Sequence, residues 1–346
     1  MTAGLRVEEF DPGRASEADL HGYYRVMLAR QQTDRADEPA LSFEDVVGRL
    51  RNPFVGFGPV AYWVARLDQD VVGLAVVYFL EEESSHVALV DLVVHPAVRR
   101  KGIGSTLLKT LLPELRARGR RLVEAWQVTK DSDGDRWASS LNCAVARTAV
   151  LQVLVIPETE SALWRQGALD GYRLRRWAGA APDELVSSFA DARNAVNDAP
   201  LGDGSYQPPE WTVERVRARE AELRQNDVEL RAVVAVHEET GQVVGLTELE
   251  LHPHRPQAGF QRDTAVCSPH RGRGLGRHMK AHMIHWLLAD RPDFDRILTT
   301  TNAENTHMIR LNHQLGFKTV RGMLVVNRDL AELEADLSAR CSAMAP

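Results

Sequence analysis

The residues best suited to chemistry form one short turn in the second half of the chain. This turn consists of Arg271, Gly272, Arg273, Gly274, Leu275 and Gly276. Glycine has no Cβ, so three glycines let the backbone come close to a bulky anion. The first amides of a helix that begins at Leu275 would lack internal partners, and the helix dipole favours negative charge there. The arginines add charged, forked donors. The pattern therefore predicts a phosphate-binding turn, and because no Gly-Lys-Ser/Thr follows, it is not a Walker loop.

A second copy of this pattern lies in the first half of the chain. Arg99, Gly102 and Gly104 repeat the Arg-x-x-Gly-x-Gly spacing 172 positions earlier (271 minus 99). Each copy also has an aspartate eight residues before its arginine, Asp91 in the first (99 minus 91) and Asp263 in the second (271 minus 263). Two matches at one offset indicate an internal duplication.

Regular elements must hold each turn in place, and the hydrophobic pattern predicts them. Strands are expected directly before the turns, over 87–94 and 260–266. Helices are expected directly after them, over 103–118 and 275–288. The other expected strands cover 5–10, 61–67, 71–80, 121–128, 149–156, 172–177, 231–237 and 242–251. We expect the strand at 149–156 to end the first sheet.

The other helices and loops are predicted from capping and turn residues. Helices are expected to begin near Ser16, Ser42, Asp183 and Thr212. A polar turn over 238–241 predicts a hairpin between the strands on either side of it. Loops are expected over 130–135 and 197–209, and a connecting segment over 157–167. The loop over 197–209 is either a wall of the acceptor pocket or a plain surface loop.

A strand, the Arg-x-x-Gly-x-Gly turn and a helix together resemble the acetyl-CoA pyrophosphate loop of the GNAT superfamily of N-acetyltransferases. The resemblance covers nearly the whole chain, and the arrangement is similar to two-domain acetyltransferases of actinobacteria. It implies an α+β fold with a mixed sheet in each of two tandem GNAT-like domains, over 1–165 and 166–346. It also implies acetyl-CoA as co-substrate and no metal.

The second half matches this family more fully than the first. Asn302 and Asn305 are expected to bind the cofactor by resemblance, and Leu315-Gly316-Phe317 is similar to the family's ending of the fourth helix. At the corresponding place the first half has Leu141-Asn142-Cys143. We therefore expect the second domain to be catalytic. The first is expected to be structural or a vestigial cofactor site, although it keeps its phosphate turn.

Acetyl transfer from a thioester needs a polarised carbonyl and a general base for the amine. By resemblance, the backbone amides of Ala265 and Val266 hold the carbonyl. The family commonly takes its base from a carboxylate on the third or fourth strand. Glu248 and Glu250 share one face of the third strand, and Asp263 lies on the fourth. We favour Glu248 and then Asp263; alternatively, each carboxylate only caps a strand or forms a salt bridge.

The group that protonates the departing thiolate is less clear from the sequence. The family usually has a tyrosine four residues before the glycine of Leu-Gly-Phe, and here that position is Asn312 (316 minus 4). An asparagine cannot act as the acid. Water, His307 or His313 would then protonate the thiolate, while Asn312 is left to hydrogen-bond the sulfur.

Two other groups of residues suggest different chemistry. His278, His282 and His285 share a helix face, which could hold zinc, but no cysteine or carboxylate completes a ligand set. A flank of the helix is the preferred interpretation. Cys267 follows the motif strand and could act as a nucleophile if a histidine activated it. By resemblance, the family transfers the acetyl group directly from the thioester to the amine, so we do not expect a covalent acyl-enzyme.

Composition restricts the classes of function. Of 346 residues, 44% are hydrophobic and 26% charged, as in soluble globular proteins. The net charge of -6 gives no basic field for nucleic acid. Three scattered cysteines argue against a disulfide framework. The first residues lack an apolar signal segment, and no run is long enough to span a membrane. A cytoplasmic protein without nucleic-acid or membrane partners is expected.

These observations predict an acyltransferase that moves an acetyl group from acetyl-CoA to the amine of a small molecule by direct transfer. Two alternatives remain open. One is acetylation of a protein lysine or N-terminal amine, and the other is a non-catalytic module that senses acyl-CoA. The acceptor has no motif of its own. A monomer and a homodimer are both compatible with the built-in duplication.

Overall fold

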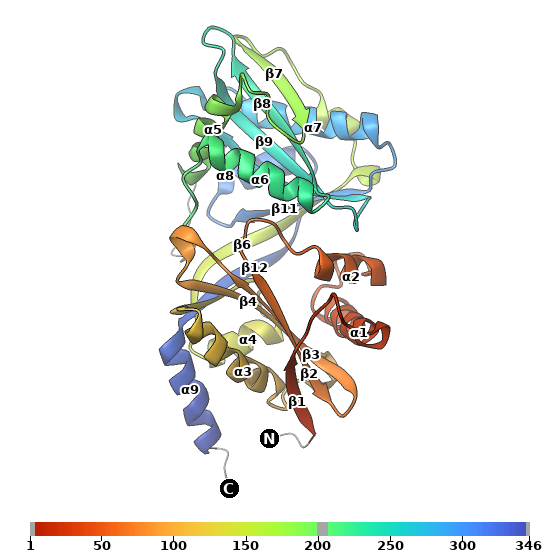
Figure 1. Cartoon of the computed structure of the whole chain (residues 1–346). Coiled ribbons are helices and arrows are strands. Elements are labelled where there is room, and N and C mark those ends of the chain that lie inside the picture. Colours follow the sequence, from red (N-terminus) through yellow and green to blue (C-terminus); the bar gives the residue numbers. More distant parts are fainter. Residues whose placement is uncertain (1–3, 199–206, 344–346) are drawn as a thin grey trace. The chain divides into compact units, whose positions relative to one another are not determined.

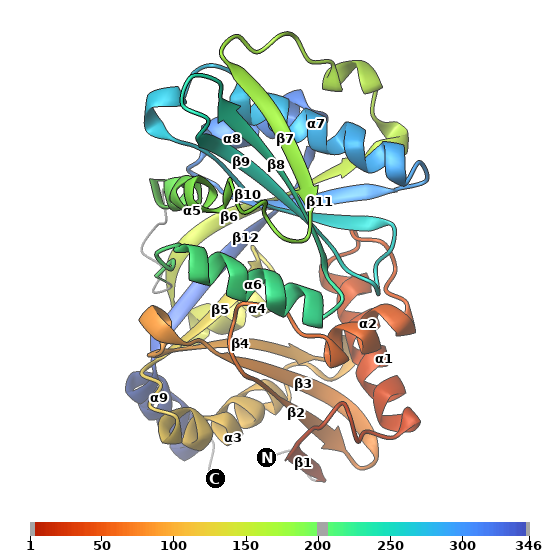
Figure 2. The same ribbon diagram turned by 45° about the horizontal axis from the view of Figure 1, so that its top comes forward.

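The computed structural model describes residues 4–198 and 207–343, and its contacts divide the chain into two compact units (Figure 1). Unit 1 comprises Met1–Thr148, Gly202–Gln207 and Gly322–Pro346, and unit 2 comprises Ala149–Leu201 and Pro208–Arg321. Each unit is a mixed sheet with helices packed on it (Figure 2). This confirms the predicted fold class.

Unit 1 has the strand order β1-β2-β3-β4-β5-β12. Its strands are β1 (Leu5–Glu9), β2 (Val60–Leu67), β3 (Asp70–Phe79), β4 (Val87–Val94), β5 (Leu122–Thr129) and β12 (Lys318–Asp329). Its helices are α1 (Glu17–Asp34), α2 (Phe43–Arg51), α3 (Ile103–Ala117), α4 (Asp133–Ser140) and α9 (Leu330–Ala343). Neighbouring strands are antiparallel except β4 and β5, which are parallel.

Unit 2 has the strand order β6-β11-β10-β9-β8-β7. Its strands are β6 (Ala144–Val155), β7 (Tyr172–Ala178), β8 (Glu229–His237), β9 (Val243–Leu251), β10 (Ala258–Val266) and β11 (Arg296–Asn302). Its helices are α5 (Val186–Asn194), α6 (Val213–Gln225), α7 (Leu275–Asp290) and α8 (Thr306–Gln314). Here the parallel pair is β10 and β11.

The capping residues predict the helix starts well. Ser16 and Ser42 form complete capping boxes with Asp19 and Asp45, and Thr212 accepts from the backbone N–H of Arg215. The predicted hairpin between β8 and β9 is confirmed. Part of the predicted loop over 197–209 lies outside the described residues. The predicted loop over 130–135 is wrong at its end, because Ser132 caps α4, which begins at Asp133.

Each sheet is completed by a strand that the sequence did not assign to it. β6 was predicted to end the first sheet, but residues 149–155 pair with β11 of unit 2. β12 pairs with β5 of unit 1 through Met323–Asp329. The contacts therefore divide the chain after Thr148 and again after Arg321, which differs from the single boundary predicted near residue 165. Strand pairing between segments far apart in sequence is the physical cause.

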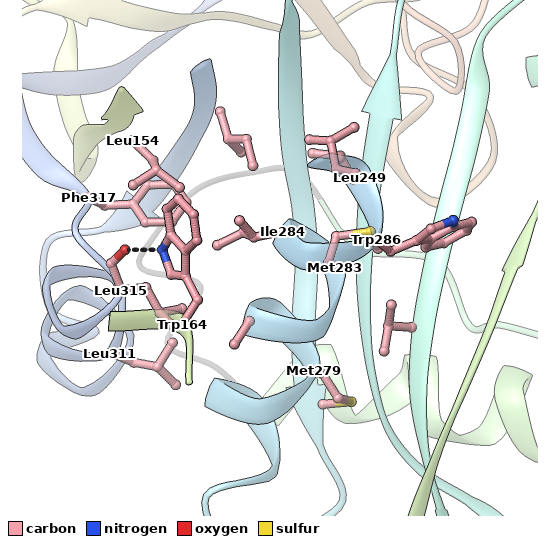
Figure 3. Close-up of a cluster of buried hydrophobic side chains, with 14 of the residues drawn as sticks. Leu154, Trp164, Leu249, Met279, Met283, Ile284, Trp286, Leu311, Leu315 and Phe317 are labelled. Carbon is pink, nitrogen blue, oxygen red and sulfur yellow. Dashed lines mark hydrogen bonds between the residues drawn. The ribbon is translucent and has the colours of Figure 1, made fainter. Parts of the chain in front are cut away.

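Successive side chains of a strand point to opposite faces of the sheet. In unit 2, Val233 and Ala235 of β8 pack with α7, whereas Val234 and Val236 pack with α5 and α6. The α7 side chains predicted from helical spacing are all buried; they are Leu275, Met279, Met283, Trp286 and Leu287. Figure 3 shows part of this cluster, where the Trp164 indole donates to the carbonyl of Leu315 at 3.0 Å.

Helices long and apolar enough to cross a bilayer do not occur among residues 4–198 and 207–343.

Candidate active site

The parallel strands of unit 2 stop pairing before they end, and slot is our name for the space between their unpaired ends. β10 pairs with β11 over Ala258–Phe260, and within the described residues their pairing stops there, whereas β10 stays paired with β9 as far as Val266. The β9–β10 register shifts between Gln261 and Thr264. Such a β-bulge turns the strand and its side chains locally. The end of β10 thus presents an edge without a β11 partner.

The two predicted backbone positions lie at this edge. The Cys267 N–H donates to the carbonyl of Val244 on β9, and Ala265 lies opposite Leu246. Since successive residues of a strand direct their amides to opposite sides, the amide of Val266 points to the β11 side, whereas that of Ala265 points to β9. The pairing is thus compatible with the predicted carbonyl contact at Val266. For Ala265 that contact remains a prediction.

The glycine-rich turn directly after β10 has the conformation that its sequence demands. Gly272 and Gly274 have φ of +77° and +75°, in the left-handed region, and Gly274 is the N-cap of α7. Arg271 donates from Nε to the carbonyl of Val266 at 2.8 Å, which anchors the turn to β10. Arg273 is exposed on the turn. The turn and the first residues of α7 therefore present backbone amides at the end of the slot, because the first amides of a helix have no partner within it.

A buried carboxylate lies on the face of the sheet opposite α7. Glu248 of β9 is fully buried, and its Oε1 accepts a hydrogen bond from Nη1 of Arg193 at the end of α5. Burial raises the pKa of the Glu248 carboxyl above its ordinary value, while the positive charges of Arg193 and Arg219 act in the opposite direction. A carboxylate of this kind is suited to take up a proton.

The other predicted carboxylates have different surroundings. Glu250 is also buried, and burial alone would raise the pKa of its carboxyl. The charge of Arg262 and contacts with His252 and Arg219 outweigh burial and lower this pKa to about 2. Asp263, in the bulge of β10, has a side chain that is 41% exposed and lies 3.8 Å from Arg193. Glu248 and Asp263 are therefore brought together around one arginine, as the sequence could not show.

The asparagines of the loop after β11 have capping roles. Asn302 accepts from the N–H of Glu304 at 3.0 Å. Asn305 is the N-cap of α8 and accepts from the N–H of Met308 at 3.1 Å. These bonds fix the loop at the open end of the slot. Cofactor binding by either side chain remains a prediction.

Asn312 lies in a buried polar network of unit 2. Its Oδ1 accepts from Lys280 Nζ at 2.7 Å, and its Nδ2 donates to Gln152 Oε1 at 2.8 Å. Thr301 also donates to Gln152, at 3.3 Å. Burial lowers the pKa of Lys280 to about 7. Asn312 has no exposed surface, and both ends of its side-chain amide are hydrogen-bonded within this network. This is the amide that was expected to hydrogen-bond the thioester sulfur.

The turn of unit 1 has the same backbone shape but a different charge environment. Gly102 has φ +78°, and Arg100, at the place of Gly272, has φ +65°. Arg99 donates to Asp34 at 2.9 and 2.5 Å and to Asp133 at 3.0 Å. Two carboxylates of the chain thus engage the arginine that an anion would meet.

Other features of unit 1 separate it further from unit 2. The pairing of β3 with β4 keeps one register from Gly73–Val94 to Phe79–Ala88, so the bulge of β10 has no counterpart in these residues. A Cβ on Gly104 would meet Trp137 of α4 at 3.5 Å. The same position of unit 2, Gly276, faces Leu311 at 3.3 Å.

The histidines on α7 have separate partners. His278 contacts the carbonyl of Gly274 at 2.9 Å and His285 that of Trp164 at 3.0 Å, while burial lowers the pKa of His282. Among the described residues, no group of three histidine, cysteine, aspartate or glutamate side chains could hold a metal. Cys267 is half-buried beside the cluster of α5 and α6.

Sequence reasoning missed Arg193, Trp211 and Lys280. Arg193 was expected only as part of a helix, and Trp211 only as the residue before the Thr212 cap. Only a structure shows that Arg193 and Glu248 face each other, because they come from different elements. Lys280 interrupts the apolar face of the motif helix one turn after Gly276, which is a signal that could have been noticed.

A wider cleft of about 550 Å³ lies at the other end of the unit 2 sheet, near Glu229, His252 and Arg291. These residues flank the starts of β8, β10 and β11 rather than their ends. The cleft is therefore distinct from the slot.

Each unit thus has a glycine-rich turn between a helix and a strand that parts from its parallel neighbour. The chain belongs to the acetyltransferase (GNAT) family, which matches residues 22–136 and 201–317. It is accordingly an acyltransferase with two GNAT domains, as the sequence predicted.

Curated relatives include the mycothiol acetyltransferases of Mycobacterium avium and Thermomonospora curvata. The first is 26% identical over 241 residues, or 67% of this chain and 71% of the relative. The second is 29% identical over 230 residues, or 66% and 69%.

Two solved structures share the fold across both units. A tandem GNAT protein from the clavulanic acid biosynthesis pathway has a TM-score of 0.76 at 21% identity, covering 94% of this chain and 98% of its own. A GCN5-related N-acetyltransferase from Sphaerobacter thermophilus has a TM-score of 0.72 at 16% identity, covering 95% and 97%.

Proposed function

We propose that the chain transfers an acetyl group from acetyl-CoA to the amine of a small molecule, and that unit 2 carries out the reaction. The observation that supports this most directly is the slot between β10 and β11, which opens at a turn of glycines and arginines. An elongated thioester attached to a diphosphate fits these two features together. The turn would hold the diphosphate through the amides of Gly272–Gly276 and the charge of Arg273.

The residues around the slot have complementary roles in this proposal. The Val266 amide donates to the thioester oxygen and stabilises the charge that develops on it. Glu248 removes a proton from the acceptor ammonium, directly or through water. The amine nitrogen then forms a bond to the acetyl carbon while the carbon–sulfur bond breaks. The second proton that the nitrogen sheds passes through solvent to the departing thiolate, since the Asn312 amide is engaged inside the protein, and the protonated Glu248 then releases its own proton to solvent.

Unit 1 has a structural role in this proposal. Its turn is occupied by the Asp34–Arg99–Asp133 contacts, and a second anion there would have to displace or face two carboxylates. The unshifted register of β4 supports the same assignment.

A small-molecule acceptor is favoured over a protein because relatives that align with most of this chain are named mycothiol acetyltransferases. The acceptor of those relatives is therefore the first to test. Amino sugars, amino acids and polyamines complete a panel of primary amines.

Paired substitutions of the two turns test the cofactor assignment. Gly274→Leu and Gly102→Leu both force a leucine into left-handed backbone, so each costs about 1–2 kcal/mol of stability. Only Gly274→Leu is expected to weaken coenzyme A binding in calorimetry, by about tenfold or more. Thiol release with the amine panel should fall in parallel. If Gly102→Leu alone weakens binding, or neither does, the assignment to unit 2 fails.

A further inference from the structure

One arginine contacts both Glu248 and Asp263, the two carboxylates considered for the base. The Arg193 side chain is only 4% exposed, and it donates from Nη1 to Glu248 Oε1 and lies 3.8 Å from Asp263 through Nη2. Its guanidinium stacks over the Trp211 ring, 3.7 Å from the centroid. A buried cation that combines an ion pair with close aromatic stacking is held firmly in one place.

The neighbouring residue fixes the aromatic partner. Asn194 donates from Nδ2 to the carbonyl of Trp211 at 3.1 Å, and its Oδ1 accepts from the Trp211 N–H at 2.8 Å. The last two residues of α5 therefore contact both Trp211 and Glu248, through hydrogen bonds and the stacking of Arg193. This arrangement is rigid because each contact is made by a buried or half-buried group with a partner on a different element.

The two oxygens of Glu248 are used differently. Oε1 is bound by Arg193, whereas Oε2 is buried and has no hydrogen-bond partner among the described residues. The carboxylate borders a small cavity of about 10 Å³, together with Arg193, Arg219 and Trp211. A cavity of about this size holds one water molecule. The Nε atoms of Arg193 and Arg219, two of the residues that line this cavity, are likewise buried and have no hydrogen-bond partner among the described residues.

We propose that Arg193 is a positioning residue for the general base: it holds Glu248 through one oxygen and leaves the other to receive the acceptor's proton, directly or through one buried water. This inference rests on the proposed function, because it presumes that Glu248 acts as the base. Trp211 and Asn194 keep the guanidinium in place. The arginine thereby keeps the buried carboxylate from turning away and favours its ionised form.

Several other charges act on Glu248, so the effect of Arg193 must be isolated from theirs. The neighbouring groups come from α6, β9 and β10; they are Arg219, Glu220, Glu250, Arg262 and Asp263. Arg219 and Arg262 already interact with Glu250. Arg193 is thus the cation in direct hydrogen-bond contact with Glu248 among these groups.

The test compares Arg193→Met and Arg193→Lys with a matched control, Arg231→Met. Arg231 is a similarly buried arginine on the neighbouring strand, paired with Glu229 and Asp290 and stacked 4.6 Å from the Trp286 centroid on the opposite face of the sheet from Glu248. The Arg193→Met change removes a positive charge that favours the ionised base, so the pKa of Glu248 should rise. The acidic limb of kcat/KM should move to higher pH, with turnover at pH 6.5 reduced about tenfold or more and recovering as the pH rises.

Arg193→Lys keeps the positive charge, so the acidic limb of its kcat/KM profile should lie close to that of the wild type. Arg231→Met should leave the pH of this limb unchanged even if it destabilises the fold. A carbon-13 titration of labelled glutamate, assigned with Glu248→Gln, reports the coupling without any turnover. Loss of activity in Arg193→Met with an unmoved limb and an unmoved Glu248 titration would overturn the inference. If wild-type protein acetylates no amine, the proposed function fails, while the titration still decides whether Arg193 controls Glu248.

Discussion

Glu248 carries a titratable group into the protein interior, so its protonation depends on each neighbour. Burial raises the pKa of this carboxyl, and a base must be ionised to accept a proton. Activity should therefore be lost as the pH falls through the raised pKa of Glu248, and this loss should begin at a higher pH than for an exposed glutamate. Glu250, two residues away, has its pKa lowered to about 2 and stays charged throughout.

Replacing Glu248 by Gln tests the role of the base. The amide keeps the shape of the side chain but cannot take a proton, so kcat should fall by about 10²–10⁴. Coenzyme A affinity, measured by calorimetry, should stay the same, because the turn is untouched. Near-normal turnover in this variant would transfer the role to Asp263, for which Asp263→Asn is the companion variant.

Lys280 gives a separate prediction about stability. Its pKa is lowered to about 7 in the folded state, against an ordinary value near 10.5. Between these values the unfolded chain binds more protons than the folded one, so the free energy of unfolding should rise as the pH increases from about 7 to 10. Denaturant unfolding at several pH values measures this rise, which should be smaller in Lys280→Met. An equal rise in both proteins would show that Lys280 does not cause it.

At the scale of elements, the same strand, turn and helix serve two purposes in this chain. In unit 2 the turn presents glycines and arginines beside a bulged strand. In unit 1 the turn is closed by side chains from the end of α1 and the start of α4. In the proposed function, Asp34 and Asp133 take the place of an anion beside Arg99. The turn of unit 1 then connects α1 with α4 instead of binding a ligand.

Removing one of these carboxylates should cost stability. Asp34→Ala breaks the two bonds of Arg99 to α1, and both side chains are less than one-fifth exposed, at 15% and 18%. The expected cost is about 1–3 kcal/mol in the free energy of unfolding. Glu114→Ala removes an exposed pair with Arg118, the C-cap of α3, and should cost less than about 0.5 kcal/mol. Similar costs for the two variants would show that the closing contacts stabilise little.

The sequence predicts local elements well and non-local partners poorly. Capping residues located α1, α2 and α6, and the spacing of Leu275, Met279 and Met283 gave the buried face of α7, because these signals are local. The contact of Arg193 with Glu248 could not be predicted, since it joins residues 55 positions apart. The partner strands of β5 and β6 are even farther apart in the chain, and no nearby residue specifies them.

Of the two glycine-rich turns, the proposed function assigns the anion to the one in unit 2, because carboxylates engage the arginine of the one in unit 1. Calorimetry with coenzyme A should therefore give about one site per chain. Asp34→Ala combined with Asp133→Ala should not abolish that site, because it belongs to unit 2. A stoichiometry of two in the wild-type protein would show that unit 1 also binds the cofactor.

β12 and α9 return to unit 1 after the chain has built unit 2. A fragment that stops at residue 165 would lack the strand that pairs with β5, and it would expose the part of α3 against which α9 now packs. No single cut can therefore release an intact half. Exchanging a domain with that of another tandem enzyme requires two junctions, near residues 148 and 322, so a library of chimaeras should be designed around an insertion rather than a fusion.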